Sequence, residues 1–146
     1  MKRVLSSLSI VVCLLVMSGW SSTAVAQEKK PGRNIVSLYQ VSAGKHVEFL
    51  KWMARQEAAT KEAGGPATQW YVHQDGASWD FVAITPELEP AKQAEVEKKT
   101  EAIAKQKGLA TGLKAAFEFR QFMGTHSDTF AVGPMTADEI VKAAEK

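Results

Sequence analysis

The order of its predicted strands and helices restricts the fold of this chain more than any other feature of the sequence. Residues 34–41 (NIVSLYQV), rich in apolar and β-branched side chains, predict a first strand. A long helix is expected over 43–63, with Ser42 as its N-cap and Gly64-Gly65-Pro66 as its stop signal. The chain is therefore predicted to open as a strand followed by a long helix.

A β-hairpin and a second helix are predicted next. Aromatic and β-branched residues crowd both arms of the hairpin, 68–75 and 78–85, and Asp75-Gly76 supplies the turn. The second helix is expected over 87–107, where Gly108 closes it. Its surface is dominated by Lys, Glu and Gln, which indicates a face exposed to solvent.

The C-terminal part completes the order of elements. Residues 109–123 fit either a helix, which we favour, or a strand, and 125–132 (THSDTFAV) predict the last strand. Thr136, with Glu139 three residues on, predicts a capping box at the start of a short terminal helix. The full order, β-α-β-β-α-(α)-β-α, is typical of an α+β fold of the ferredoxin-like kind. Its antiparallel sheet has helices on one face, and we expect a second copy of the chain to cover the other.

The first 26 residues have the three-part layout of a cleaved secretory signal peptide. Lys2 and Arg3 give a basic start, residues 9–17 (SIVVCLLVM) are apolar but too short to span a bilayer, and Ala24-Val25-Ala26 is the expected cleavage site. We divide the chain into a signal peptide (1–26), a flexible leader (27–33) and one α+β domain (34–146). The prediction is a periplasmic or secreted protein with no membrane segment after cleavage.

Cleavage after Ala26 would also change the charge and the cysteine content. The chain carries 18 Lys and Arg against 16 Asp and Glu, and loss of Lys2 and Arg3 would leave 16 basic residues. A formally neutral domain gives no support for nucleic acid as a partner. The single cysteine, Cys13, lies inside the signal, so disulfides, thiolate metal sites and cysteine nucleophiles are excluded from the mature domain.

Strand parity predicts an aromatic wall on one face of the sheet. One set of residues is expected to face the helices: Val36, Leu38, Trp70, Val72, Val82 and Ile84. The opposite set is Ser37, Tyr39, Gln69, Tyr71, His73, Trp79 and Phe81. We interpret this wall as a small-molecule cavity in which Tyr39, Tyr71, Trp79 and Phe81 bind the ligand and His73 acts as a base. The alternative is a dimer interface filled by aromatic side chains, with His73 inert.

Two further candidate sites lie near the C-terminus. His126 and Asp128 share one face of the predicted last strand, which favours a carboxylate-oriented imidazole and adds both to the catalytic candidates. Ser127 lies between them and points to the opposite face, so the three do not form a nucleophilic triad. Arg120 is a candidate for binding a ligand carboxylate, with a structural salt bridge as the alternative.

Cofactor signals are few. The sequence has no Gly-rich phosphate loop, no dinucleotide fingerprint, no HExxH and no GxSxG. Its three histidines, His46, His73 and His126, lack the HxH or HxxxH spacing of metal sites. We therefore expect no metal and no cofactor, although a haem-handling variant would take an axial imidazole from His73 or His126.

Two segments resemble a known superfamily. Residues 39–50 (YQVSAGKHVEFL) are similar to the strand-turn-helix opening of dimeric α+β barrel proteins, which include antibiotic-biosynthesis-monooxygenase-like and NIPSNAP-like domains. Gly133-Pro134 with Thr136 and Glu139 resembles the close of such domains. The resemblance implies a dimeric ferredoxin-like fold and the position of a pocket. It selects no reaction, since the superfamily holds cofactor-free oxygenases, haem-degrading enzymes, isomerases and members without known activity.

Three functions remain open from the sequence. The favoured one is an exported homodimer that binds a small apolar or aromatic ligand. The enzymatic alternative is a cofactor-free oxygenase or isomerase in which His73 or His126 accepts a proton. The third is a structural or interaction protein whose aromatic sheet face only forms the dimer. The sequence does not decide whether the protein is an enzyme.

Overall fold

The computed structural model describes residues 31–146, so the predicted signal peptide and its cleavage site lie outside the described residues. Its elements in chain order are β1 (Gly32–Val41), α1 (His46–Glu62), β2 (Gln69–Val72), β3 (Phe81–Pro86), α2 (Pro90–Gln106), α3 (Gly112–Arg120), β4 (Met123–Gly133) and α4 (Ala137–Ala144). Strand β1 begins at Gly32, so the last two residues of the predicted leader take part in the sheet. Residues 109–123, which fitted either a helix or a strand, contain α3.

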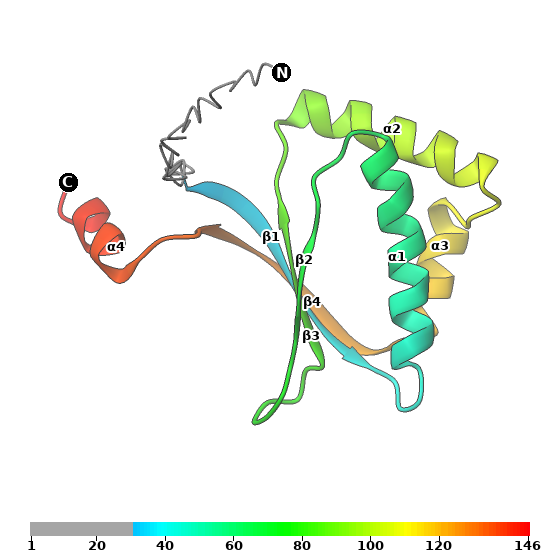
Figure 1. The fold of residues 1–146 in the computed structure, drawn as a ribbon, viewed down its shortest axis with the longest axis horizontal. Helices are drawn as coiled ribbons and strands as arrows, with labels where there is room; N and C mark the ends of the chain where they lie inside the picture. Colours follow the sequence, from blue (N-terminus) through cyan, green and yellow to red (C-terminus); the bar gives the residue numbers. More distant parts are fainter. Residues whose placement is uncertain (1–30) are drawn as a thin grey trace, which may run out of the picture.

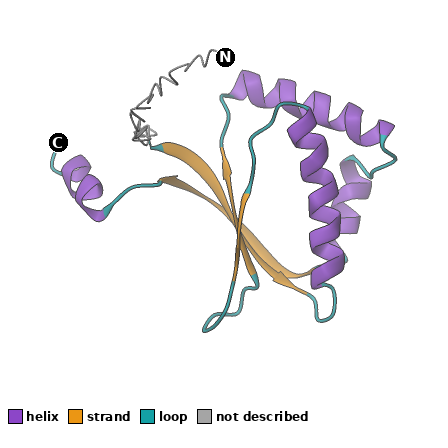
Figure 2. Ribbon diagram, in the orientation of Figure 1, coloured by secondary structure: helices purple, strands orange, loops and turns teal. Residues whose placement is uncertain are grey.

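The four strands form one sheet in the order β2-β3-β1-β4, with each neighbouring pair antiparallel. Helices α1, α2 and α3 lie together on one side of this sheet, whereas α4 stands apart at the end of β4 (Figures 1 and 2). The other face of the sheet carries no helix within residues 31–146. This arrangement confirms the α+β, ferredoxin-like architecture with helices on one face.

The predicted assignment of sheet faces is wrong for β1 and β3. Tyr39 and Phe81 are buried on the helix-covered face, not on the opposite one. Phe49 of α1, which is 0% exposed, packs against both, with ring centroids 5.3 Å from Tyr39 and 6.0 Å from Phe81. Both parities of β1 are largely apolar, so a period of two does not distinguish its faces. The packing of Tyr39 and Phe81 against Phe49 of α1 decides which face of each strand is buried.

The start of α1 also differs from the prediction. Its first helical residue is His46, and Ser42 belongs to the turn before it. The carbonyl of Ser42 accepts the N–H of Lys45 at 2.9 Å, and its own N–H donates to the carbonyl of Phe122 at 2.7 Å. Gly44 lies within this turn at a φ of +78°, a conformation that favours glycine. The turn uses the backbone of Ser42, so the helix starts four residues after it.

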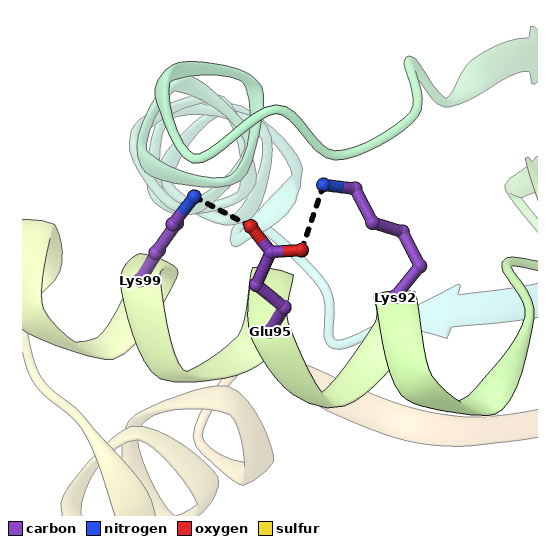
Figure 3. A network of polar contacts seen from close by, with 3 residues as sticks. All are labelled: Lys92, Glu95 and Lys99. Carbon is purple, nitrogen blue, oxygen red and sulfur yellow. Dashed lines mark hydrogen bonds and ion pairs between the residues drawn. The ribbon is translucent and has the colours of Figure 1, made fainter.

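The predicted capping box and the predicted solvated face are both confirmed. At the start of α4, the Thr136 hydroxyl accepts the backbone N–H of Glu139 at 3.3 Å, and the Glu139 carboxylate accepts the backbone N–H of Thr136. On α2, the Glu95 carboxylate lies between Lys92 and Lys99, at 2.9 and 2.6 Å (Figure 3). Hydrogen bonds from these two lysines lower the pKa of Glu95 to about 2. This side of α2 is therefore a charged face exposed to solvent.

Candidate functional site

The structure separates the residues of the predicted aromatic wall. Tyr39 and Phe81 belong to the core under the helices. Tyr71 lies on the opposite sheet face, 51% exposed, and its hydroxyl donates to Gln69 at 3.2 Å. The prediction that these three line one cavity is therefore wrong, because alternate residues of β1 and β3 face the other way from the expected register.

His73 and Trp79 lie in the loop that joins β2 to β3. The His73 Nε2 accepts the backbone N–H of Ala77 at 3.3 Å, and its ring centroid is 4.2 Å from that of Trp79. The paired strands end at Val72 and resume at Phe81, so this loop is longer than the two-residue turn expected at Asp75-Gly76. His73 therefore lies at the start of the loop, where its backbone N–H still donates to the carbonyl of Asp80 at 2.9 Å.

Arg120 is the last residue of α3 and is exposed. It makes no ion pair with any side chain of the described part of the chain. The salt bridge expected as its structural role is therefore absent from residues 31–146. Its role in binding a carboxylate stays a prediction.

His126 and Asp128 share one face of β4, as predicted, and the structure shows that this is the helix-covered face. The His126 Nε2 lies 3.6 Å from an Asp128 carboxylate oxygen, and the His126 ring stacks on Tyr39 with centroids 6.3 Å apart. The other oxygen of Asp128 accepts the hydroxyl of Ser37 at 2.6 Å, and Ser37 is only 8% exposed. A string of polar groups therefore runs from exposed His126 through Asp128 and Ser37 to buried Tyr39.

The surroundings of the Tyr39 hydroxyl shift its pKa. Burial raises the pKa of Tyr39, the hydrogen bond with Ser37 opposes the rise, and the negative charges of Asp128 and Glu57 add to it. Two carboxylates thus act on one buried phenol, and the protonated phenol is the stable form at neutral pH.

A cleft lies between the sheet and the helices beside this phenol. One cavity, of about 500 Å³, is bounded by α1 and the sheet; Tyr39, Glu57, Trp70 and Ala83 are among its lining residues. A second cavity, of about 430 Å³, lies between α1, α2 and the start of α3. Four lining residues are common to both: Gln56, Thr60, Pro66 and Thr85. We call the two adjoining cavities the helix-side cleft.

Trp70 and Glu57 line the cleft, although neither was predicted as a ligand-binding residue. Trp70 was assigned correctly to the helix-covered face, where it stacks on Tyr39 with centroids 5.5 Å apart. Its indole N–H donates to the Glu57 carboxylate at 2.6 Å. A signal for Glu57 exists in the sequence, because Gln56 and Glu57 follow Met53 by three and four residues and so interrupt the apolar stripe of α1 with polar groups.

The uncovered face of the sheet has a hollow of its own. A cavity of about 900 Å³ lies there, and Val36, Tyr71, Ile84 and Ala131 contribute to its lining. Leu38 and Val82 have the same parity on β1 and β3. This face therefore exposes a band of apolar and aromatic side chains.

Metal-binding and membrane features are scarce in the described residues. No group of three His, Cys, Asp or Glu side chains within residues 31–146 is arranged to hold a metal ion. None of the helices in this range combines the length and the hydropathy needed to cross a bilayer.

Two solved structures of other proteins have a similar fold. A NIPSNAP domain protein from Burkholderia xenovorans superposes with a TM-score of 0.50 at 13% identity, covering 72% of this chain and 96% of that one. SnoaB from Streptomyces nogalater, a cofactor-independent oxygenase, superposes with a TM-score of 0.50 at 18% identity, covering 72% and 95%. The chain shares the ferredoxin-like α+β fold of these two proteins. The resemblance seen in the sequence is thus confirmed at the level of fold. No protein-family model matches the sequence, and no curated protein does.

Proposed function

We propose that this chain is an exported domain that binds a small apolar or aromatic molecule in the helix-side cleft. The observation that carries the proposal is the cavity of about 500 Å³ with Tyr39 and Trp70 in its wall. Its volume falls in the range of small-molecule sites, and its wall combines apolar groups with a few polar ones. Export is supported by the signal-peptide layout of residues 1–26.

The proposal includes a homodimer formed through the uncovered face of the sheet. The aromatic and apolar side chains Val36, Tyr71 and Ile84 line this face without a helix above them in residues 31–146. Apolar faces of this kind are normally covered, and the resemblance of residues 39–50 to dimeric α+β barrel proteins implies a dimer. The ligand site and the dimer interface then lie on opposite faces of one sheet.

Native mass spectrometry on protein purified from its own host tests both parts. We expect a dimer with added mass that disappears on denaturation. Ala54 is exposed on α1 and lines the cleft, so Ala54→Trp should fill the cleft and abolish the added mass. Ala102→Trp, at an exposed position of α2 away from the cleft, is the matched control and should retain it. Retention of the added mass by Ala54→Trp would contradict the assignment of the site.

A second candidate is a cofactor-free oxygenase, the activity named for SnoaB. The observation that favours it is the polar string from His126 through Asp128 and Ser37 to Tyr39, which joins the aromatic cleft to an exposed imidazole. In this function His126, rather than His73, accepts the proton from the substrate. Oxygen uptake with the ligand identified by mass spectrometry tests it. His126→Ala should abolish the uptake while ligand binding survives, and absence of uptake in the unmodified protein would rule it out.

A further inference from the structure

We propose that the helix-side cleft selects ligands that carry a protonated amine on an aromatic body, with Glu57 as the counter-ion. This inference rests on the proposed function and specifies the chemistry of the ligand.

The first argument is the state of the Glu57 carboxylate. Glu57 is partly buried on α1, and its Oε1 accepts the Trp70 indole N–H at 2.6 Å. Within residues 31–146 no hydrogen bond or ion pair engages its Oε2. Oε2 is open to solvent, and a charged N–H donor of a ligand is the strongest partner that can replace water there. The cleft thus presents one oxygen with capacity for a ligand N–H group.

The second argument is the sign of the charge around the cleft. Glu57 and Lys61 are the charged residues in the lining of one cavity, and Glu97 and Glu101 are those of the other. Lys61 is exposed at the rim and forms no ion pair with Glu57, although it follows one turn later on α1. Because Glu101 is paired with Lys105 at 2.7 Å, Glu57 and Glu97 remain against Lys61, a balance that opposes the entry of an anion and favours a cation.

The third argument is the aromatic wall beside Glu57. Tyr39 and Trp70 stack with an interplanar angle of 21°, and both line the cavity. The negative faces of aromatic rings attract ammonium groups. The same rings bury the apolar body of a ligand. An arylalkylamine, which is protonated at neutral pH, satisfies the carboxylate, the charge and the stacking surface together.

Isothermal titration calorimetry with three naphthalene probes tests the inference. 1-Naphthylmethylamine, 1-naphthalenemethanol and 1-naphthoate share one ring system and differ in charge, and each is titrated at pH 7 into residues 27–146. We expect the amine to bind at least about tenfold more tightly than the alcohol, and the naphthoate to bind most weakly. Similar affinities of the amine and the alcohol, or tightest binding of the naphthoate, would overturn the inference and leave the proposed function intact. Binding of none of the probes would count against both.

Two conservative variants assign the effect to one carboxylate. Glu57→Gln keeps an oxygen for the Trp70 indole and removes the charge, so the preference for the amine should fall to within about threefold while the alcohol binds as before. Alcohol binding also shows that the variant is folded. Glu118→Gln is the matched control, because Glu118 accepts the Trp52 indole N–H at 3.0 Å outside the cleft lining. A preference that survives in Glu57→Gln, or disappears in Glu118→Gln, would contradict the assignment.

Discussion

Replacement of Phe49 by Ala should remove the centre of the core. The side chain is 0% exposed, and its ring centroid lies 5.3 to 6.3 Å from those of five other rings: Tyr39, Trp70, Phe81, Phe119 and Phe122. Truncation of a buried Phe costs about 3–5 kcal/mol, because the lost contacts leave a cavity that its neighbours only partly fill. Domains of this size have a free energy of unfolding of about 5–15 kcal/mol. The Phe49→Ala variant should therefore lose a large part of its stability.

Urea unfolding followed by tryptophan fluorescence measures this loss. With a slope of about 1–3 kcal/mol per molar urea, the midpoint should fall by about 2 M. The matched control is Phe117→Ala on α3, where the side chain is 59% exposed and the expected change is below about 0.5 kcal/mol. Equal losses in the two variants, or a loss below about 1 kcal/mol in Phe49→Ala, would refute the packing of α1 on the Tyr39 face of the sheet.

Four further predictions concern single side chains. Burial raises the pKa of Tyr39, so alkaline absorbance should show it ionising above its usual value of 10, and the unfolding free energy should fall above pH 10 because the unfolded chain releases this proton first. Asp128→Ala removes the acceptor of the buried Ser37 hydroxyl and should lower the free energy of unfolding in urea by about 1–3 kcal/mol. If the losses of Asp128→Ala and Ser37→Ala simply add in the double variant, the hydrogen bond between the two side chains is contradicted. Because the pKa of Glu95 is lowered in the folded state, its ion pairs stabilise the fold above the unfolded pKa near 4.5, and this stabilisation is lost as the pH falls towards 2. Acid unfolding of Glu95→Gln should therefore depend less on pH in that range. Thr136→Ala removes a capping box and should speed amide hydrogen exchange in α4 by weakening it by about 1 kcal/mol, while exchange in α1 stays unchanged.

The order of elements could be predicted from the sequence because local signals mark it. The run Gly64-Gly65-Pro66 ends α1, Gly108 follows α2 at a φ of +68°, and Thr136 with Glu139 begins α4. Each signal acts within a few residues, so no tertiary contact is needed to interpret it. The ferredoxin-like architecture follows from this order.

The composition of the site could not be predicted because it depends on register and loop length. Leu38 and Tyr39 are both compatible with a buried face, and only packing against Phe49 distinguishes them. His73 was expected in a strand, but the longer hairpin loop removes it from the sheet. His126 and Asp128 were predicted correctly to share a face, because that inference needs only the alternation within one strand.

The central claim, that a ligand occupies the helix-side cleft, is tested most directly by NMR of the tryptophan indole N–H groups. Trp70 lines the cleft, whereas Trp79 lies in the hairpin loop beside His73 and outside the cleft lining, so the two signals report different places. During titration with 1-naphthalenemethanol, the Trp70 indole signal should shift and saturate while the Trp79 signal stays in place. Movement of the Trp79 signal with an unchanged Trp70 signal, or binding without any change at Trp70, would contradict the claim.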